Sequence, residues 1–298
     1  MSDPTTPSGT PPAQGLADVL PARATERATA PLVTFYDDAT GERIELSGAT
    51  FGNWVAKTAN LLVDGLGAEP GDQVTLALPP HWQTAVWLFA CWSAGLVAAP
   101  MPLAVPSPDG SADRSDGTDR AERSDGTDGS DGADVLVVTE PDLPRALAAG
   151  GAAEIVGLSL HALGGPLRDC PPGVTDYAAE IRAYGDRFAP YAPVDPDAPA
   201  LRVMSLTFTG VELTAKAISF VTNNGLDSST RALTTVPYHT VEGLLTGLLG
   251  PVVAGGSVVI TRNIDKAALD RRISLEQVTA VAGVSGWDPP SGSAYRQP

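Results

Sequence analysis

Short apolar runs with the character of buried strands alternate with helix-like segments along nearly the whole chain, and this alternation limits the fold more than any other feature. In the first half, apolar runs at residues 74–78 and 96–99 flank a segment from His81 to Ala94 that has helical length and is closed by Gly95. The same order returns later, with strands predicted at residues 202–208, 232–236, 257–260 and 278–282. Repeated units of this kind predict an α/β fold with two largely parallel sheets and flanking helices.

Turn residues and prolines divide the chain into predicted units. Residues 32–36 and 43–46 predict a hairpin around the turn Asp-Asp-Ala-Thr-Gly at 37–41. Residues 1–14, rich in Ser, Thr, Pro and Gly, predict a disordered tail. We expect a first α/β subdomain at 15–188, a Pro-rich connector at 189–199, a second α/β subdomain at 200–284 and a flexible tail at 285–298.

An acidic repeat at residues 107–133 interrupts the first subdomain. The hexamer Arg-Ser-Asp-Gly-Thr-Asp occurs at 114–119 and again at 123–128, and the segment offers no large apolar side chain to bury. This composition predicts a disordered insert. Calcium binding by the recurring aspartates is the alternative, but known calcium loops space their ligands and glycines differently.

The charge of the chain excludes several classes of partner. The formal net charge is -16, so we expect no binding to nucleic acid and no attraction to an anionic membrane. The two cysteines, Cys91 and Cys170, are far apart and predict neither a disulfide framework nor a zinc site. The N-terminus lacks the basic start and apolar run of a secretory signal, so we expect a cytoplasmic protein.

Residues 208–216 lie between a predicted strand and a predicted helix, where a phosphate-binding loop would stand. Such loops turn backbone N–H groups toward the phosphate and commonly use several glycines, but only Gly210 is present. Lys216 has the spacing to neutralise a phosphate, whereas Ala217 replaces the magnesium-binding hydroxyl of a P-loop and Glu212 would repel phosphate. The segment is either a degenerate phosphate loop or an ordinary strand–turn–helix with a solvated lysine.

Four segments, in this order along the chain, carry a family resemblance. They are ATFGNWVAKTANLLVDGLGAEPGDQV at 49–74, VTLALPPHWQTAVWLFACWSAGLVAAPMP at 74–102, TFTGVELTAKAIS at 207–219 and TTVPYHTVEGLLTGLLGPVVAGGSVVI at 234–260. Together they resemble the N-terminal domain of the adenylate-forming enzymes, which include acyl-CoA synthetases, luciferases and peptide-synthetase adenylation domains. The third segment is similar to the family's Thr-Ser-Gly-Thr-Thr-Gly-x-Pro-Lys-Gly loop, and the fourth to its Pro-aromatic-His segment.

The resemblance implies a chemistry and a set of site residues. Enzymes of this family join a carboxylate to ATP, release pyrophosphate and leave an acyl-adenylate. By resemblance, Thr209, Gly210, Thr214 and Lys216 would face the phosphates of ATP or AMP with its magnesium. Tyr238 and the adjacent His239 would line the carboxylate or acyl pocket. The other interpretation of Tyr238 and His239 is a strand-end pair packed against the following helix.

The resemblance also implies what is missing before Pro298. The family's magnesium-binding glutamate, its ribose-binding aspartate and the lysine of its C-terminal domain would all come later, so no catalytic residue or metal ligand is assigned. Because adenylation depends on groups that stabilise charge on the transferring phosphate, we expect a truncated, non-catalytic binding or interaction module. The alternative is an ATP-dependent acyl-activating enzyme of reduced design, a carboxylate–AMP ligase completed by a partner. Surface that the missing region would cover predicts a homo- or hetero-oligomer.

Overall fold

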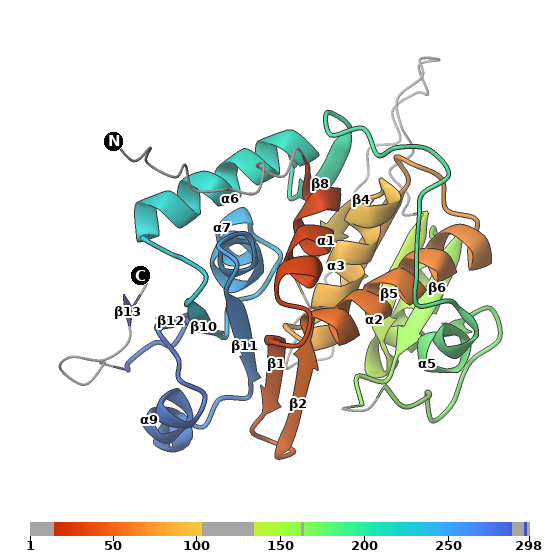
Figure 1. Cartoon of the computed structure of the whole chain (residues 1–298). Helices are drawn as coiled ribbons and strands as arrows, with labels where there is room; N and C mark the ends of the chain where they lie inside the picture. The colour runs from red at the N-terminus through yellow and green to blue at the C-terminus, as the bar shows by residue number, and fades with distance from the viewer. Residues whose placement is uncertain (1–14, 103–133, 162–163, 288–294, 297–298) are drawn as a thin grey trace, which may run out of the picture.

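The computed structural model describes residues 15–102, 134–161, 164–287 and 295–296, which form two β-sheets with helices between and around them (Figure 1). Within these residues, all neighbouring strands are parallel except in the hairpins β1–β2 and β8–β9. The predicted fold class, an α/β fold with two largely parallel sheets, is therefore confirmed.

The described strands form a six-stranded and a seven-stranded sheet. The first has the order β13 (Tyr295–Arg296), β12 (Ala280–Ala282), β10 (Arg231–Thr234), β11 (Ser257–Arg262), β1 (Pro31–Asp37) and β2 (Glu42–Ser47). The second has the order β7 (Thr175–Asp176), β6 (Glu154–Leu158), β5 (Val135–Thr139), β3 (Gln73–Ala77), β4 (Val97–Pro100), β8 (Pro199–Val203) and β9 (Leu206–Thr209).

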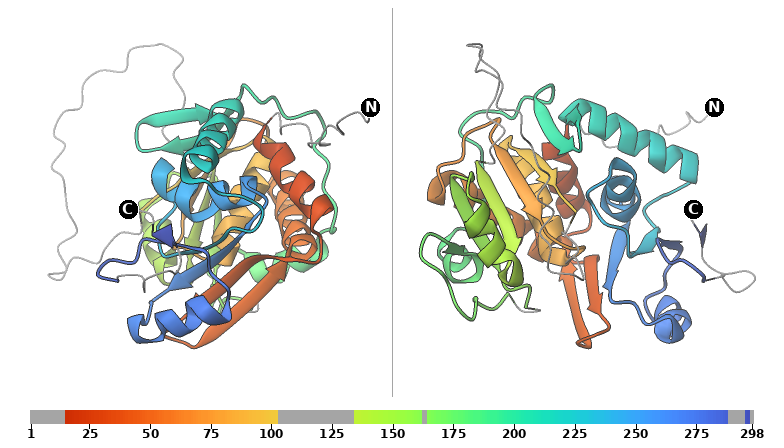
Figure 2. Two further views of the ribbon diagram at one scale, coloured as in Figure 1. Left: turned by 60° about the vertical axis from the view of Figure 1, so that its left-hand side comes forward. Right: turned by 180° about the vertical axis from the view of Figure 1, so that it is seen from behind.

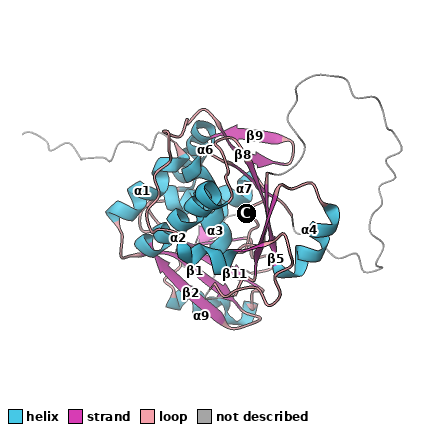
Figure 3. Ribbon diagram, turned by 90° about the vertical axis from the view of Figure 1, so that its right-hand side faces the viewer, coloured by secondary structure: helices cyan, strands magenta, loops and turns pink. Residues whose placement is uncertain are grey.

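Helices connect most of the parallel strands, as Figure 3 shows by colour. The longer ones are α1 (Leu16–Glu26), α2 (Gly48–Asn60), α3 (Trp82–Ala94), α4 (Leu143–Ala149), α6 (Gly210–Asn224) and α9 (Lys266–Leu275). Single turns complete the set: η1 (Leu61–Gly65), η2 (Glu140–Asp142), α5 (Tyr177–Glu180), η3 (Ile181–Ala183), α7 (Val241–Leu244), η4 (Leu245–Leu249) and α8 (Gly250–Val253).

Helix α3 lies between the two sheets because it is apolar on every side (Figure 1). Every residue of α3 except Ser93 is buried, including all three of its tryptophans. The helix begins after His81, whose ring accepts the N–H of Gln83, and ends at Gly95 in the left-handed conformation (φ 73°). A helix that is buried all round can only be a core element, so α3 joins the two sheets into one core.

A buried carboxylate ties the six-stranded sheet to the end of α9. Glu276 accepts hydrogen bonds from Tyr36 and Arg43 on Oε1 and from Arg231 on Oε2. Burial alone would raise the pKa of Glu276, but these three hydrogen bonds hold it below its ordinary value. Strands β1, β2 and β10 are thereby fixed against one helix end.

The two sheets divide the chain differently from the expected sequential units. Strands β1 and β2, from the first half, pair in the sheet built by the second half, and β8 and β9, beyond the Pro-rich connector, complete the sheet of the first half. The two predicted subdomains are therefore interleaved, because pairing between distant strands depends on the core and not on the local turn signal. The predicted tail at 1–14 and the predicted insert at 107–133 lie outside the described residues. Of the predicted tail at 285–298, Tyr295 and Arg296 pair with β12.

A second hairpin replaces the single strand predicted at residues 202–208. Strands β8 and β9 pair antiparallel, with Val203 opposite Leu206, so that only Met204 and Ser205 make the turn. Met204 takes a positive φ of 55°, which is uncommon for a residue other than glycine. Both views of Figure 2 show this hairpin beside the first turn of α6.

Candidate functional site

The first turn of α6 is the place where the family resemblance puts a phosphate, and it is closed by its own side chains. The Thr209 hydroxyl accepts the N–H of Glu212 at 3.2 Å, and the Glu212 carboxylate accepts the N–H of Thr209 at 3.0 Å. These two reciprocal bonds form a capping box. The carboxylate therefore stands at the positive end of the helix, where an anion would otherwise bind.

The remaining N–H groups of this turn are also used within the chain. Gly210 donates to the carbonyl of Ala198 at 3.3 Å, and Val211 donates to the carbonyl of Pro196 at 2.8 Å. A Cβ added to Gly210 would lie 3.1 Å from the Pro196 oxygen, so this glycine allows close packing of the connector. From Thr209 to Glu212, each backbone donor has an acceptor.

The other two predicted phosphate ligands are also engaged with their own helix or strand. Thr214 is buried and its hydroxyl donates to the carbonyl of Gly210 at 2.8 Å. Lys216 is exposed, and its Nζ lies 5.4 Å from the centre of the Phe208 ring. The structure thus brings Thr209, Gly210, Thr214 and Lys216 together on two turns of one helix, with each making a contact inside the chain.

The second predicted group, Tyr238 and His239, follows β10 and precedes α7. The Tyr238 ring is buried against Gly247 of η4, and its hydroxyl is buried without a hydrogen-bond partner among the described residues. Burial raises the pKa of Tyr238. His239 is half-buried. No hydrogen bond, ion pair or ring contact in the described part of the chain joins this pair to the predicted phosphate ligands.

His81 is a third polar group with an unusual environment. It is fully buried and packs edge-on against Phe35, with ring centres 4.2 Å apart. Its Nδ1 caps α3, whereas Nε2 has no partner among the described groups. Burial, assisted by the charge of Arg262, lowers the pKa of His81 to about 3. The imidazole is therefore neutral at physiological pH and acts as a helix cap.

One signal in the sequence would have identified the closed turn. Thr209-Gly210-Val211-Glu212 has the T-x-x-E pattern of a capping box, which places Glu212 at the helix end as a structural acceptor. Glu212, which would repel a phosphate, therefore serves here as the acceptor for the N–H of Thr209.

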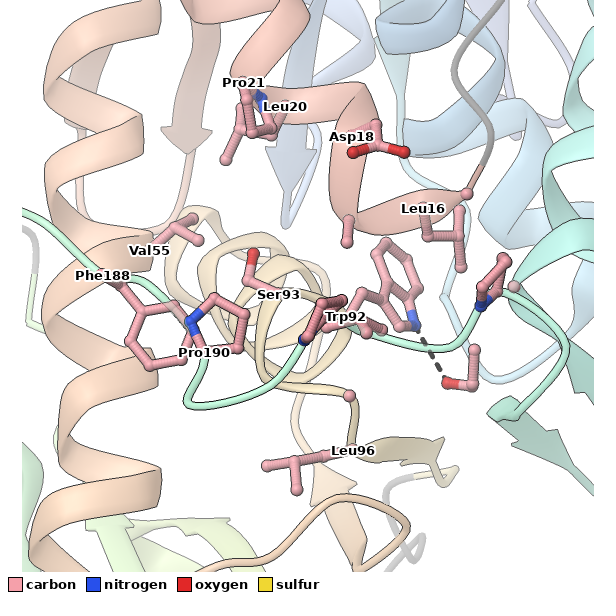
Figure 4. A pocket seen from close by; sticks show the side chains of 18 of the residues that line it. Leu16, Asp18, Leu20, Pro21, Val55, Trp92, Ser93, Leu96, Phe188 and Pro190 are labelled. Atoms are coloured by element: carbon pink, nitrogen blue, oxygen red, sulfur yellow. Dashed lines mark hydrogen bonds between the residues drawn. The ribbon is translucent and has the colours of Figure 1, made fainter.

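A separate groove opens between α1, α2, α3 and the connector before β8. Its volume is about 680 Å³, and its lining is mostly apolar. Figure 4 shows Trp92 and Ser93 of α3 between Asp18 on α1 and Phe188 and Pro190 on the connector. The indole N–H of Trp92 donates to the carbonyl of Ala200 at 3.0 Å, which fixes the start of β8 to α3. The sequence did not indicate this groove, since its walls come from four segments that are separate in the sequence: α1, α2, α3 and the connector.

The described residues offer neither a metal centre nor a membrane-spanning helix. No group of three or more His, Cys, Asp or Glu side chains there has the arrangement to hold a metal ion. None of the described helices is both long and apolar enough to cross a bilayer.

Known proteins match this chain in sequence and in structure. A family model described as AMP-binding enzyme matches residues 20–109. A TIGR03089 family protein of Mycobacterium tuberculosis is 37% identical over 255 residues, which cover 84% of this chain and 90% of that protein. A feruloyl-CoA synthase of an Amycolatopsis species is 27% identical over 243 residues, covering 80% of this chain and 43% of the synthase. The N-terminal domain of FACL13 from M. tuberculosis superposes with a TM-score of 0.68 at 17% identity, over 91% of this chain and 63% of that one.

The fold and these matches define the class as the adenylate-forming, AMP-binding superfamily, of which the described residues form the N-terminal-domain fold. Within that class, the chain belongs to the TIGR03089 family. It spans less than half the length of the feruloyl-CoA synthase but nearly all of the mycobacterial relative.

Proposed function

We propose that this chain is a non-catalytic binding or interaction module that keeps the fold of the adenylate-forming enzymes. The observation that carries this proposal is the capping box of α6, in which Glu212 occupies the anion position at the helix end. A triphosphate placed there would have to displace a carboxylate from its hydrogen bond to Thr209 and would then face its negative charge.

The state of the neighbouring donors supports the same proposal. Phosphate loops work because several N–H groups point at the anion without an acceptor of their own. Here Gly210 and Val211 donate to the connector, and Thr214 donates back into its own helix. Among the predicted ligands, Lys216 alone keeps an exposed donor group, and one lysine without aligned backbone donors offers only a screened surface charge.

A thermal-shift panel tests the proposal. The protein is heated with ATP, AMP, CoA and a set of carboxylates, with and without magnesium. A ligand present at a hundred times its dissociation constant would add about 2.7 kcal/mol to the free energy of unfolding, which is readily visible. We expect no shift with any nucleotide. Stabilisation by magnesium–ATP that is lost on Lys216→Ala, together with carboxylate-dependent pyrophosphate exchange, would instead identify an acyl-activating enzyme.

We also propose that the module forms an oligomer through the edge of β9 that pairs with no described strand. Met204 is 86% exposed and Leu206 57% exposed, and both stand at the tip of the hairpin. The stretch VMSLTFT at 203–209 contains no charge and no proline, the two devices that commonly protect an edge strand from pairing. An antiparallel pair of identical edges would extend the seven-stranded sheet across a two-fold axis.

Light scattering after size-exclusion chromatography in about 0.15 M salt, where screening limits repulsion between acidic copies, tests the oligomer. We expect a dimer for the natural chain and a monomer for Leu206→Lys. Leu275→Lys is the matched control, since Leu275 is 68% exposed on α9 at the other sheet. A monomeric natural chain would contradict the proposal.

We further propose a cytoplasmic location, which the two free cysteines, Cys91 and Cys170, support.

A further inference from the structure

The groove between α1, α2, α3 and the connector has the features of a small-molecule site. Its volume of about 680 Å³ lies in the range of ligand pockets, and most of its lining is apolar. Trp92 is only 2% exposed and is held beneath the groove by its hydrogen bond to Ala200, whereas Phe188 and Pro190 supply the more exposed apolar surface. That bond fixes the start of β8, the strand that follows the connector, to α3.

Helix α3, which is otherwise buried, contributes one polar side chain to the groove. Ser93 is its single residue that is not buried, and it lines the groove. The Ser93 hydroxyl donates to the carbonyl of Phe89 at 2.8 Å, which leaves its oxygen lone pairs directed away from that bond. An otherwise fully covered helix therefore presents one polar acceptor at the floor of an apolar groove.

Helix α2 contributes a glycine that the packing of the protein does not require. Gly52, Val55 and Ala56 share one face of α2 and line the groove. A glycine inside a helix costs about 1 kcal/mol relative to alanine. The other wall glycines have a reason within the chain, because a Cβ on Gly15 or Gly210 would contact Pro196 and Gly95 ends α3 with a φ of 73°. A Cβ on Gly52 would meet no atom of the described residues within 4 Å, so among them this glycine only keeps space open.

Charge at the rim decides which kind of molecule fits. Asp18 and Asp195 line the groove and are exposed, and Asp186 lies there in an ion pair with Lys57 at 3.0 Å. Arg187 is the basic side chain among the lining residues. The rim therefore carries more negative than positive charge, on a chain whose net charge is -16. A carboxylate or phosphate ligand would be repelled at this site.

We propose that this groove binds an apolar small molecule that carries a cationic head. The apolar part lies against Phe188 and Pro190 and over the open space beside Gly52, and the head lies at the rim beside Asp18. The groove borders the first turn of α6 at Gly210, but the groups that would hold the ligand lie on α1, α2, α3 and the connector, so binding here does not require a nucleotide at α6. A ligand of this charge is also unlike the carboxylates that acyl-activating enzymes consume.

Isothermal titration with three probes of one shape tests the proposal: 4-phenylbutylammonium, 4-phenylbutanol and 4-phenylbutanoate, in about 0.15 M salt to screen nonspecific attraction. We expect the ammonium to bind more tightly than the alcohol, and the alcohol more tightly than the carboxylate. Equal or tighter binding of the carboxylate, or no binding of the ammonium, would overturn the proposal.

Variants locate the bound probe. Gly52→Leu fills the groove while raising helix propensity, so we expect a melting temperature no lower than that of the natural chain and ammonium affinity weakened by about tenfold or more. Ala215→Leu, on the exposed face of α6, is the matched control and should leave the affinity unchanged. Asp18→Asn, at an exposed position, should weaken the ammonium by about two- to fivefold, as exposed ion pairs do, and leave the alcohol unchanged. Undiminished binding by Gly52→Leu would place the probe elsewhere and refute the site.

Discussion

Removing the capping box of α6 should lower the free energy of unfolding, because each of its two side chains accepts one backbone hydrogen bond at the helix end. Thr209→Ala leaves the N–H of Glu212 without its acceptor, and Glu212→Ala leaves the N–H of Thr209 without its acceptor. Loss of an N-terminal cap costs about 1 kcal/mol, so we expect each variant to lose about that free energy of unfolding. Both donors are partly exposed, so water replaces the lost acceptor and keeps the loss near this value. In a thermal melt it corresponds to a fall of about 2–4 °C.

Two controls separate the hydrogen bond from the charge. Glu212→Gln keeps an acceptor for Thr209 and removes only the interaction with the helix dipole, so it should cost less than about 0.5 kcal/mol. Glu242→Ala removes a glutamate from the first turn of α7, where no side-chain hydrogen bond of that residue is found among the described contacts. If Glu212→Ala melts no lower than Glu242→Ala, the carboxylate does not hold the helix end and the interpretation of the closed turn fails.

Two buried groups give further predictions. Glu276→Ala should cost about 3 kcal/mol, because it leaves the partly buried Arg231 with only the more distant Glu45 at 3.9 Å, whereas the more exposed Glu45→Ala should cost less than about 1 kcal/mol in the same denaturant titration. Since the folded pKa of Glu276 is lowered, its contribution to the free energy of unfolding is present above its unfolded pKa and is lost as the pH falls below about 4. If Glu276→Ala and Glu45→Ala show the same dependence of unfolding free energy on pH, this prediction is wrong. For His81, with a folded pKa of about 3, the unfolded chain takes up a proton first, so stability should fall as the pH drops from about 6.5 toward 3, by about 2 kcal/mol between pH 7 and 5. His81→Asn keeps a capping acceptor and should lack this dependence; an unchanged slope would show that His81 is not its source.

Elements with strong local signals could be predicted from the sequence. The hairpin β1–β2 follows from the Asp-Asp-Ala-Thr-Gly turn, whose Gly41 has a φ of 74°, and α3 ends at the Gly95 that its pattern indicated. The turn of β8–β9 could not be predicted in this way. It contains neither Gly, Pro nor Asn, and Met204 takes its positive φ because the paired strands on both sides require it.

The candidate site was predictable only in part. The capping pattern at Thr209 and Glu212 is visible in the sequence, but the acceptors of Gly210 and Val211 come from the connector, whose position depends on the sheet that β8 joins. The groove beside α3 depends likewise on long-range packing. Gly52 marked it in the sequence only as an unexplained glycine in a helix, a signal that acquires meaning once the empty space beside it is known.

The most direct test of the closed turn is an amide NMR titration with magnesium–ATP. If the backbone donors from Thr209 to Glu212 are occupied within the chain, their ¹H–¹⁵N resonances should stay in place at millimolar nucleotide, in the natural chain and in Lys216→Ala alike. A saturable shift of these amides in the natural chain that disappears in Lys216→Ala would show that the turn opens to receive phosphate, and it would contradict the proposal of a non-catalytic module.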